Sequence, residues 1–584
     1  MPEVITDHLD VWTSTLLTKS AVGRGSNGKL EAYGIKKLRE LILELAVRGK
    51  LVPQDPNDEP ASELLDRIAQ DKARLLAEGE CYKTPTMLEI TDEETPFVIP
   101  SSWEWVRLGD LGPIFNGNSI SERVKEAKYT GNEGGLPFIA TKDVGYGWQP
   151  LDYKNGVSIP VGEPNFKVAH QAAVLICCEG GSAGKKCGIT NRDICFGNKL
   201  YALDPLAGVS SNFLLANYLT PTFFAQFTAK MTGIIGGISL ANFNQLLVPL
   251  PPVNEQDRIV AKVDELMALC DQLEQQQTDS LTAHQTLVET LLGALTRVES
   301  QQEFSAAWAR IASHFEILFA SEASIDQLKQ SILQLAVMGK LVPQIPNDEA
   351  VGKLLARIAK ERQSILGRAA KITVEEGAAL GFDIPDSWRW QPLGNLLTFG
   401  PTNGISPQAV DFETSVRSLT LSATTSGRFK GEHFKFIAEE IPADSDLWLR
   451  KGDLLVQRGN TIEYVGVPAV YQGEPNQFVY PDLMMKLRVS SELSVDFIHL
   501  AMSHIQAREY LRTRATGTSG TMPKINQTTL RSLPIPIPPY AEQKRIVAKV
   551  DELMALCDTL KARLTDAQAI QLHLADAVVE QAVA

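Results

Sequence analysis

Apolar residues recur at alternating spacings of four and three in two nearly identical segments of the chain. The positions are Ile259, Val263, Leu266, Cys270 and Leu273 in the first segment, and Ile546, Val550, Leu553, Cys557 and Leu560 in the second. This is the 3.5-residue repeat of a coiled-coil seam. The seam continues less regularly as far as Leu295, so the pattern predicts one long helix over about residues 255–297 and a matching helix at 540–584.

A second helical pattern also occurs twice. Its apolar positions, at spacings of three, four and three, are Ile35, Leu38, Ile42 and Leu45, and then Ile325, Leu328, Ile332 and Leu335. Gly49 and Gly339 follow these segments, and the end of a helix favours a left-handed residue such as glycine. Two apolar seams joined by a connection predict an antiparallel helical pair. A coiled coil that dimerises the protein is the alternative.

These segments belong to longer internal repeats. Residues 42–69 and 332–359 are identical at 20 of 28 positions, and residues 256–273 and 543–560 at 16 of 18. The central part of the chain holds one copy of each repeat, 256–273 and 332–359. The N-terminal part holds only the other copy of the second of these, at 42–69, and the C-terminal part holds only the other copy of the first, at 543–560. If the two ends meet, they rebuild the central part. The repeats therefore predict a circular arrangement with a pseudo-two-fold axis.

The repeats alternate with two blocks that resemble each other only faintly. Apolar runs at 137–140, 173–177 and 454–457 predict strands, and 212–230 and 495–514 have helical patterns. We expect two α/β (α+β) domains joined by long antiparallel coiled-coil helices. The predicted organisation is an N-terminal helical segment at 1–95, a block at 96–252, a helical spacer at 253–384, a second block at 385–539 and a C-terminal helix at 540–584.

Composition changes this picture in one respect. The 584 residues carry a net charge of −14, which argues against nucleic acid as a partner. The acid is unevenly spread, however, because block 96–252 has 12 basic and 11 acidic residues and block 385–539 has 15 of each. A basic face on either block remains compatible with these counts. We see no signal peptide, membrane-spanning run or disulfide framework and expect a cytoplasmic protein.

Basic residues beside glycine-rich turns are the candidate chemistry of the blocks. Residues 180–186 resemble a phosphate loop, but Glu179 and Lys186 stand where that motif needs Gly and Ser or Thr. Lysines with backbone amides suit DNA phosphates, whereas Arg can read guanine and Asn adenine. The candidate DNA-binding residues are Lys142, Lys185, Lys186, Arg192, Lys199, Arg428, Lys430, Arg458, Asn460, Arg512, Arg514 and Lys524. A solvated turn or helix face is the alternative for each.

The sequence shows no motif for a nucleotide cofactor, a catalytic nucleophile or a paired metal site. Cys177, Cys178, Cys187 and Cys195 cluster in the first block, but their spacing is not that of zinc ligands. We expect buried thiols there. We therefore expect no catalytic centre, cofactor or metal in this chain.

The repeats and the ends of the blocks together resemble a known family. Each block opens with an IP-x-SW-x-W element, at residues 99–105 and 384–390, and closes in a PLPP or PIPP run followed by EQ-x-RIV. The helical repeats include the unit LAV-x-GKLVPQ. In these features the chain closely resembles, over nearly its whole length, the specificity (S) subunits of type I restriction–modification enzymes.

The resemblance implies a non-catalytic subunit of a restriction endonuclease and adenine methyltransferase complex. Each block would be a target recognition domain that reads one half of a bipartite, asymmetric double-stranded DNA site, and the helices would set the gap. The implied partners are two modification subunits that use S-adenosylmethionine, and restriction or translocase subunits that use ATP and Mg. A coiled-coil scaffold without DNA readout and a fused DNA-modifying enzyme with unrecognised motifs are the alternatives.

Overall fold

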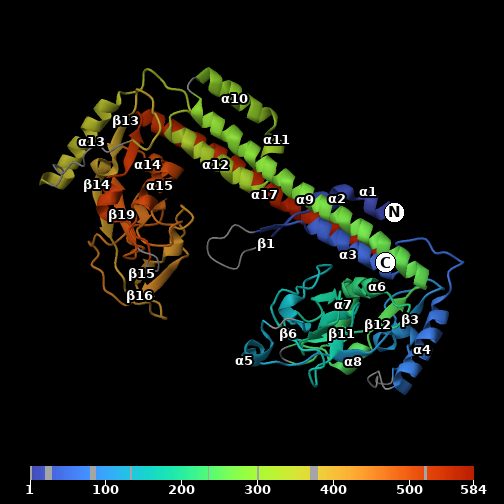
Figure 1. Ribbon diagram of the computed structural model, residues 1–584. Helices are drawn as coiled ribbons and strands as arrows, with labels where there is room; N and C mark the ends of the chain where they lie inside the picture. Colours follow the sequence, from blue (N-terminus) through green and yellow to red (C-terminus); the bar gives the residue numbers. More distant parts are fainter. Residues whose placement is uncertain are drawn as a thin grey trace. The chain divides into compact units, whose positions relative to one another are not determined.

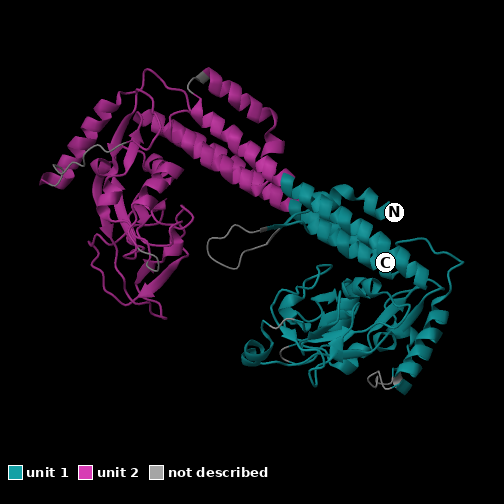
Figure 2. Ribbon diagram, viewed as in Figure 1, with its two compact units in different colours: residues 1–22, 27–279, 568–584 teal, residues 23–26, 280–567 magenta. Residues whose placement is uncertain are grey.

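The structure is a computed structural model that describes residues 3–19, 29–78, 87–131, 134–233, 236–298, 301–368, 379–517 and 522–584. The chain forms two compact units, which Figure 2 shows in different colours. Unit 1 contains residues 1–22, 27–279 and 568–584, and unit 2 contains residues 23–26 and 280–567. Two long helices, α9 (Val253–Arg297) and α17 (Tyr540–Val583), contribute one part to each unit.

Two four-stranded sheets form the α/β domain of unit 1 (Figure 1). The first is antiparallel and has the order β4 (Ile114–Asn116), β11 (Leu200–Leu203), β8 (Val174–Cys177) and β9 (Cys187–Ile189). The second has the order β6 (Ser158–Ile159), β5 (Leu136–Ile139), β10 (Ile194–Phe196) and β7 (Val168–Ala169). The domain closes on itself because its first strand β3 (Glu104–Arg107) pairs with its last strand β12 (Leu247–Leu250).

The helices of this domain begin at hydroxyl side chains. The N-cap residues of α6 (Ser211–Tyr218), α7 (Pro221–Ala229) and α8 (Leu240–Asn244) are Ser210, Thr220 and Ser239. Each hydroxyl accepts a hydrogen bond from a backbone N–H three residues later, which satisfies a donor that the helix leaves free. Helix α6 then packs against β8 and β9 of the main sheet. A short helix, α5 (Glu122–Val124), follows β4.

The long helices of unit 1 share a second core. Helix α3 (Tyr33–Val47) packs its apolar residues against those of α9, and Ala575 and Val578 near the end of α17 are buried in the same cluster. Polar contacts reinforce this packing, since Tyr33 Oη donates to Asp576 Oδ1 at 2.8 Å and Lys37 Nζ lies 3.2 Å from the same oxygen. The last part of α17 therefore belongs to the core of unit 1.

Smaller elements complete unit 1. Helices α1 (Glu3–Asp7) and α2 (Leu9–Ser14) precede a hairpin of β1 (Leu17–Lys19) and β2 (Lys29–Glu31). Helix α4 (Ala61–Glu78) contributes apolar residues to the core of the α/β domain. Its burial follows from the periodic pattern of its apolar positions.

Unit 2 repeats the main sheet of unit 1. The strand order is β14 (Leu397–Asn403), β19 (Met484–Val489), β17 (Leu454–Gln457) and β18 (Pro468–Val470). Strand β13 (Arg389–Pro392) pairs with β20 (Pro534–Ile537), as β3 does with β12. A two-stranded sheet of β15 (Val416–Leu419) and β16 (Phe434–Ile437) lies outside the main sheet. Helices α14 (Val495–Ser503), α15 (Ile505–Thr513) and α16 (Gln527–Arg531) occupy the chain positions of α6, α7 and α8.

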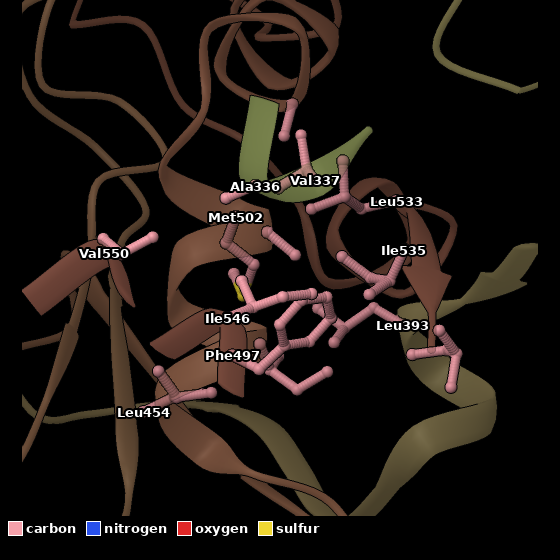
Figure 3. Packing of buried hydrophobic residues seen from close by; sticks show 14 of the residues in the cluster. Ala336, Val337, Leu393, Leu454, Phe497, Met502, Leu533, Ile535, Ile546 and Val550 are labelled. Atoms are coloured by element: carbon pink, nitrogen blue, oxygen red, sulfur yellow. The ribbon is translucent and has the colours of Figure 1, made fainter. Parts of the chain in front are cut away.

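The helices and the α/β domain of unit 2 share one core. Helices α10 (Gln301–Ser313), α11 (Phe315–Leu318), α12 (Glu322–Val337) and α13 (Val351–Leu366) belong to this unit with parts of α9 and α17. Figure 3 shows Val337 of α12 and Ile546 of α17 in one cluster with Phe497 of α14 and Ile535 of β20. The contact of helix and sheet residues fixes the domain against its own helices.

The structure confirms the expectation of two sheet-containing domains with long helices. Strand β17 coincides with its predicted run, and β5 and β8 match theirs to within one residue at each end. Helix α9 begins at Val253, two residues before the predicted start. Gly49 and Gly339 have φ angles of 66° and 71°, the left-handed conformation expected after a helix. Among the described residues, no helix is both long and apolar enough to cross a membrane.

Candidate nucleic-acid interface

The candidate lysines of unit 1 lie around the loop between β8 and β9, residues 178–186 (the β8–β9 loop). Gly184 in this loop has a φ of 72°, and its N–H donates to the carbonyl oxygen of Cys177 at 2.8 Å. A Cβ at Gly184 would come within 2.8 Å of the Phe227 ring, so the loop requires glycine at this place. The turn therefore depends on glycine for both its backbone conformation and its packing against Phe227.

The two lysines of the loop have different surroundings. Lys185 is exposed, and its Nζ lies 5.9 Å from the centre of the Phe224 ring. Lys186 is half-buried, and its Nζ donates to the carbonyl oxygen of Thr141 at 3.0 Å and lies 5.2 Å from the centre of the Tyr146 ring. Lys185 is thus the more available for a ligand, while Lys186 ties the loop to the turn at 141–143.

Lys142 and Lys199 lie at the same end of the sheet. Lys142 is exposed in the turn that holds Lys186, and Asp143 stabilises this turn by accepting the N–H of Ala140 at 2.8 Å. Lys199 Nζ lies 3.7 Å from a carboxylate oxygen of Glu179, which is a residue of the β8–β9 loop. Four candidate lysines therefore surround a single loop.

Arg192 lies apart from this group. It follows β9, whose last residue Ile189 pairs with Val174 at the start of β8, so it lies at the opposite end of the main sheet. Its guanidinium is 4.9 Å from the centre of the Tyr153 ring, and its Nε donates to Asn191 Oδ1 at 3.0 Å. The residues around Arg192 in the sequence therefore gave no sign that β9 places it at the opposite end of the sheet from the lysines.

Unit 2 has a loop at the corresponding place, residues 458–467 between β17 and β18 (the β17–β18 loop). Arg458 is half-buried and donates from Nη1 to the carbonyl oxygen of Asp482 at 3.3 Å, and Lys524 forms a β-bridge with Gly459. Asn460 uses both ends of its side chain within the loop, since Nδ2 donates to Gln457 and Oδ1 accepts the N–H of Thr461 at 2.8 Å. Asn460 in this conformation shapes the loop.

Two arginines of α15 donate hydrogen bonds to the backbone of the β17–β18 loop. Arg508 and Arg512 each donate from Nη2 to the carbonyl oxygen of Glu463 at 2.8 Å. Arg508 is 93% buried, and burial, together with the charge of Arg512, lowers its pKa to about 9. The four-residue spacing of the two arginines places them on one face of α15, and their shared acceptor lies more than 40 residues earlier in the chain.

The remaining candidates of unit 2 are exposed but dispersed. Arg514 is exposed and stacks on Tyr510 with 3.8 Å between the guanidinium carbon and the ring centre. Arg428 and Lys430 are exposed on the connection between β15 and β16, and Arg428 Nη2 lies 3.7 Å from Asp558 on α17. These residues are accessible from solvent, in contrast to Arg508.

The predicted seam residues lie in the cores of the two units. Ile259, Val263, Leu266 and Cys270 are buried against α3, and Leu273 is half-buried beside them. In unit 2, Ile546, Val550 and Cys557 are buried, and Leu553 and Leu560 are half-buried.

The structure gives no support for a metal centre in its described residues. No group of three or more His, Cys, Asp or Glu side chains there could hold a metal ion. The four clustered cysteines are buried, and burial raises the pKa of the Cys178 and Cys187 thiols to about 12. The thiols are therefore protonated and packed in the core of the domain.

Comparison with known proteins identifies the family. The model of the type I restriction modification DNA specificity domain matches residues 100–283 and 424–567. The chain therefore belongs to the family of type I restriction enzyme specificity subunits. It is 37% identical over 596 residues to the EcoEI specificity subunit of Escherichia coli and 37% identical over 598 residues to the EcoAI specificity subunit of the same species, and each alignment covers 100% of this chain and 99% of the relative.

Solved structures give more distant matches. A structure from a study of complex assembly and conformational transition in the type I R-M system matches with a TM-score of 0.46 at 17% identity, over 84% of this chain and 99% of the other. The HsdS subunit of Thermoanaerobacter tengcongensis matches with a TM-score of 0.41 at 18% identity, over 84% of this chain and 98% of the other.

Proposed function

We propose that this chain directs a type I restriction–modification complex to a bipartite, asymmetric DNA target. The observation that carries the proposal is that one chain contains two α/β domains with the same main sheet, and that the loop at the same place in each carries different residues. Two different loops on one scaffold suit two unlike half-sites. The blocks 96–252 and 385–539 are then the two target recognition domains.

In unit 1, the proposed DNA-binding face is the end of the main sheet around the β8–β9 loop. Lys142, Lys185 and Lys199 would bind phosphates, since flexible ammonium groups neutralise the DNA backbone without reading sequence. Lys186 would hold the loop in place through Thr141. Arg192, which lies at the other end of the sheet, remains a separate candidate for a phosphate contact.

In unit 2, the corresponding face surrounds the β17–β18 loop. Arg458 could present its guanidinium to guanine in the major groove, and Asn460 could present its amide to adenine if DNA replaced its contacts within the loop. Arg512, Arg514 and Lys524 would bind phosphates beside it. Arg428 and Lys430 would extend this basic surface along the connection between β15 and β16.

We also propose that the helical repeats of the chain have a circular arrangement, in which the two terminal repeats together correspond to the central part. Each unit combines the first part of one long helix, the last part of the other, and one short helix, α3 or α12. The end of α17 in unit 1 has the role that the second part of α9 has in unit 2. The helices would act as an antiparallel coiled coil that sets the gap between half-sites.

The partners follow from the family. We propose that double-stranded DNA, two modification subunits and restriction or translocase subunits bind this chain. S-adenosylmethionine, ATP and Mg would be bound by those subunits. The two-fold repetition of the scaffold supports two modification subunits, because equivalent surfaces bind equivalent partners.

A domain exchange tests the proposal. Residues 96–252 are replaced by the corresponding block of a relative with another target, and the chain is assembled with its modification subunit. We expect one half-site of the selected DNA to change, while the other half-site and the gap stay the same. A chimera that assembles normally and shows an unchanged target would refute the proposal and favour a scaffold without DNA readout.

A further inference from the structure

Both long helices begin with the same buried pair of polar residues, Glu255–Gln256 on α9 and Glu542–Gln543 on α17 (the Glu–Gln pairs). All four side chains are at most 1% exposed. Buried polar groups are retained only where they form hydrogen bonds. The partners of each pair therefore show what the pair connects.

The glutamine of each pair binds the α/β domain. Gln256 Oε1 accepts the N–H of Ser210, the N-cap residue of α6, at 2.8 Å, and its Nε2 donates to the carbonyl oxygen of Pro251 at 3.0 Å. Gln543 repeats both contacts in unit 2. Its Oε1 accepts the N–H of Ser494, the N-cap residue of α14, at 2.9 Å, and its Nε2 donates to Pro538 at 3.0 Å.

The glutamate of each pair binds the segment that follows the short helix. In unit 1, Gln54 Nε2 donates to Glu255 Oε1 at 2.5 Å and Trp103 Nε1 donates to Oε2 at 2.9 Å. In unit 2, Gln344 donates to Glu542 at 2.6 Å. Trp388 is buried near Glu542, and its indole N–H falls short of hydrogen-bond geometry. Each glutamate thus joins a long helix to the repeat unit VPQ-x-PND.

Further contacts repeat around both pairs. Arg258 donates to both carboxylate oxygens of Asp58, at 3.2 and 2.6 Å, and Arg545 does the same to Asp348, at 3.3 and 2.5 Å. The tryptophans pack edge-on against aromatic residues of the domains. Trp103–Phe213 and Trp388–Phe497 both have 6.1 Å between ring centres, with interplanar angles of 82° and 80°.

Each pair is connected to the strands of a proposed DNA-binding loop through one helix. Gln256 holds the start of α6, and α6 packs against β8 and β9, which carry the β8–β9 loop. Gln543 holds the start of α14, which packs against β18 at the end of the β17–β18 loop. A shift at either pair would move the loop as one body with its helix.

We infer that the Glu–Gln pairs are positioning residues that fix the height and rotation of each recognition domain on its helix, and thereby the gap between half-sites that the protein accepts. This inference rests on the proposed function. One base pair moves a half-site by about 3.4 Å along the DNA and turns it by about 35°. Only a domain held more firmly than this can reject a gap that is one base pair too long or too short.

The test measures the gap preference of the assembled complex. Duplexes carry the two half-sites that the wild-type complex selects, with the selected gap or with one base pair added or removed. The variants are Gln54→Ala, Glu255→Gln and Gln256→Ala in unit 1, and Gln344→Ala as the matched change in unit 2. The control is Gln275→Ala, which removes a hydrogen bond to Asp279 on the exposed surface of α9.

We expect each of the four variants to lower the ratio of affinities for the selected and the altered gaps by about tenfold, because each removes a hydrogen bond to a buried charged or polar group. The preferred bases within the half-sites should not change, and the control should keep the wild-type ratio. Gln54 is exposed, so Gln54→Ala should fold even if Gln256→Ala does not.

Two results would overturn the inference. An unchanged gap preference in Gln54→Ala and Gln344→Ala would show that the pairs do not position the domains. A change in the preferred bases at unchanged gap preference would show that they act on the reading loops themselves. Selection of no half-site by the wild-type complex is a distinct result, since it would refute the proposed function and this inference with it.

Discussion

The end of the chain should stabilise the unit that contains its beginning. Val578 on α17 is 6% exposed and packs in the core of α3 and α9, whereas Leu574, one turn earlier, is 46% exposed. Val578→Ala removes two methyl-sized groups, worth about 0.8 kcal/mol each, and leaves a small cavity. We expect a loss of about 1.5–2.5 kcal/mol from unit 1. Leu574→Ala removes more apolar atoms from an exposed position and should cost less than about 0.5 kcal/mol.

Native-state hydrogen exchange can assign this loss to one unit. Peptides of α3 (Tyr33–Val47) should exchange roughly 10- to 60-fold faster in Val578→Ala, because about 1.4 kcal/mol corresponds to a factor of ten. Peptides of α12 (Glu322–Val337), the counterpart in unit 2, should keep their rates. Equal effects on both helices, or an unchanged α3, would refute the packing of the C-terminal part of α17 into unit 1.

Three further predictions concern single residues. Lys185→Ala should make the slope of log K against log salt less steep by about 1, as expected for one lost phosphate contact. DNA binding of the assembled complex between 50 and 200 mM salt measures this slope, and an unchanged slope would exclude the contact. Gly49→Ala and Gly339→Ala should each lower the free energy of unfolding by about 1–2 kcal/mol, because both residues have a left-handed backbone and a Cβ on Gly49 would lie 2.5 Å from Pro100. The loss should appear as a lower melting temperature, and a wild-type melting temperature would contradict this strain. Burial raises the pKa of Glu255, so the folded state holds its proton more tightly than the unfolded chain. The stability of the wild type relative to Glu255→Gln should therefore fall as pH rises through the folded pKa. Urea unfolding of both proteins at pH 4 to 7 measures this difference. A relative stability that rises with pH would show instead that the partners of Glu255 stabilise its carboxylate.

The helical scaffold was predictable because its signals are local and occur twice. The 3.5-residue spacing gave α9 within two residues of its observed start, and the glycines after α3 and α12 marked helix ends that the φ angles confirm. The Glu–Gln pairs were visible only as part of a repeated motif. The hydrogen bonds of their glutamates join segments about 200 residues apart, such as Gln54 and Glu255, which no spacing rule connects.

The candidate binding residues were harder to predict, because side-chain roles depend on the strand order. The pairing of β8, β9 and β11 brings Lys185 and Lys199 together, and the hydrogen bond from Lys186 to Thr141 brings Lys142 to the same loop. Arg192 lies at the opposite end of the main sheet. Arg508 looks like a surface residue of a basic helix but is buried on the carbonyl of Glu463. Residue type and neighbouring sequence do not distinguish these cases.

We propose that this one chain reads two unlike half-sites at a fixed gap. Selection of duplexes from a random DNA pool by the chain assembled with a modification subunit tests this directly. We expect two short, different, enriched sequences separated by a constant number of unspecified base pairs. Recovery of no enriched sequence, or of a single palindromic one, from a properly folded complex would contradict it.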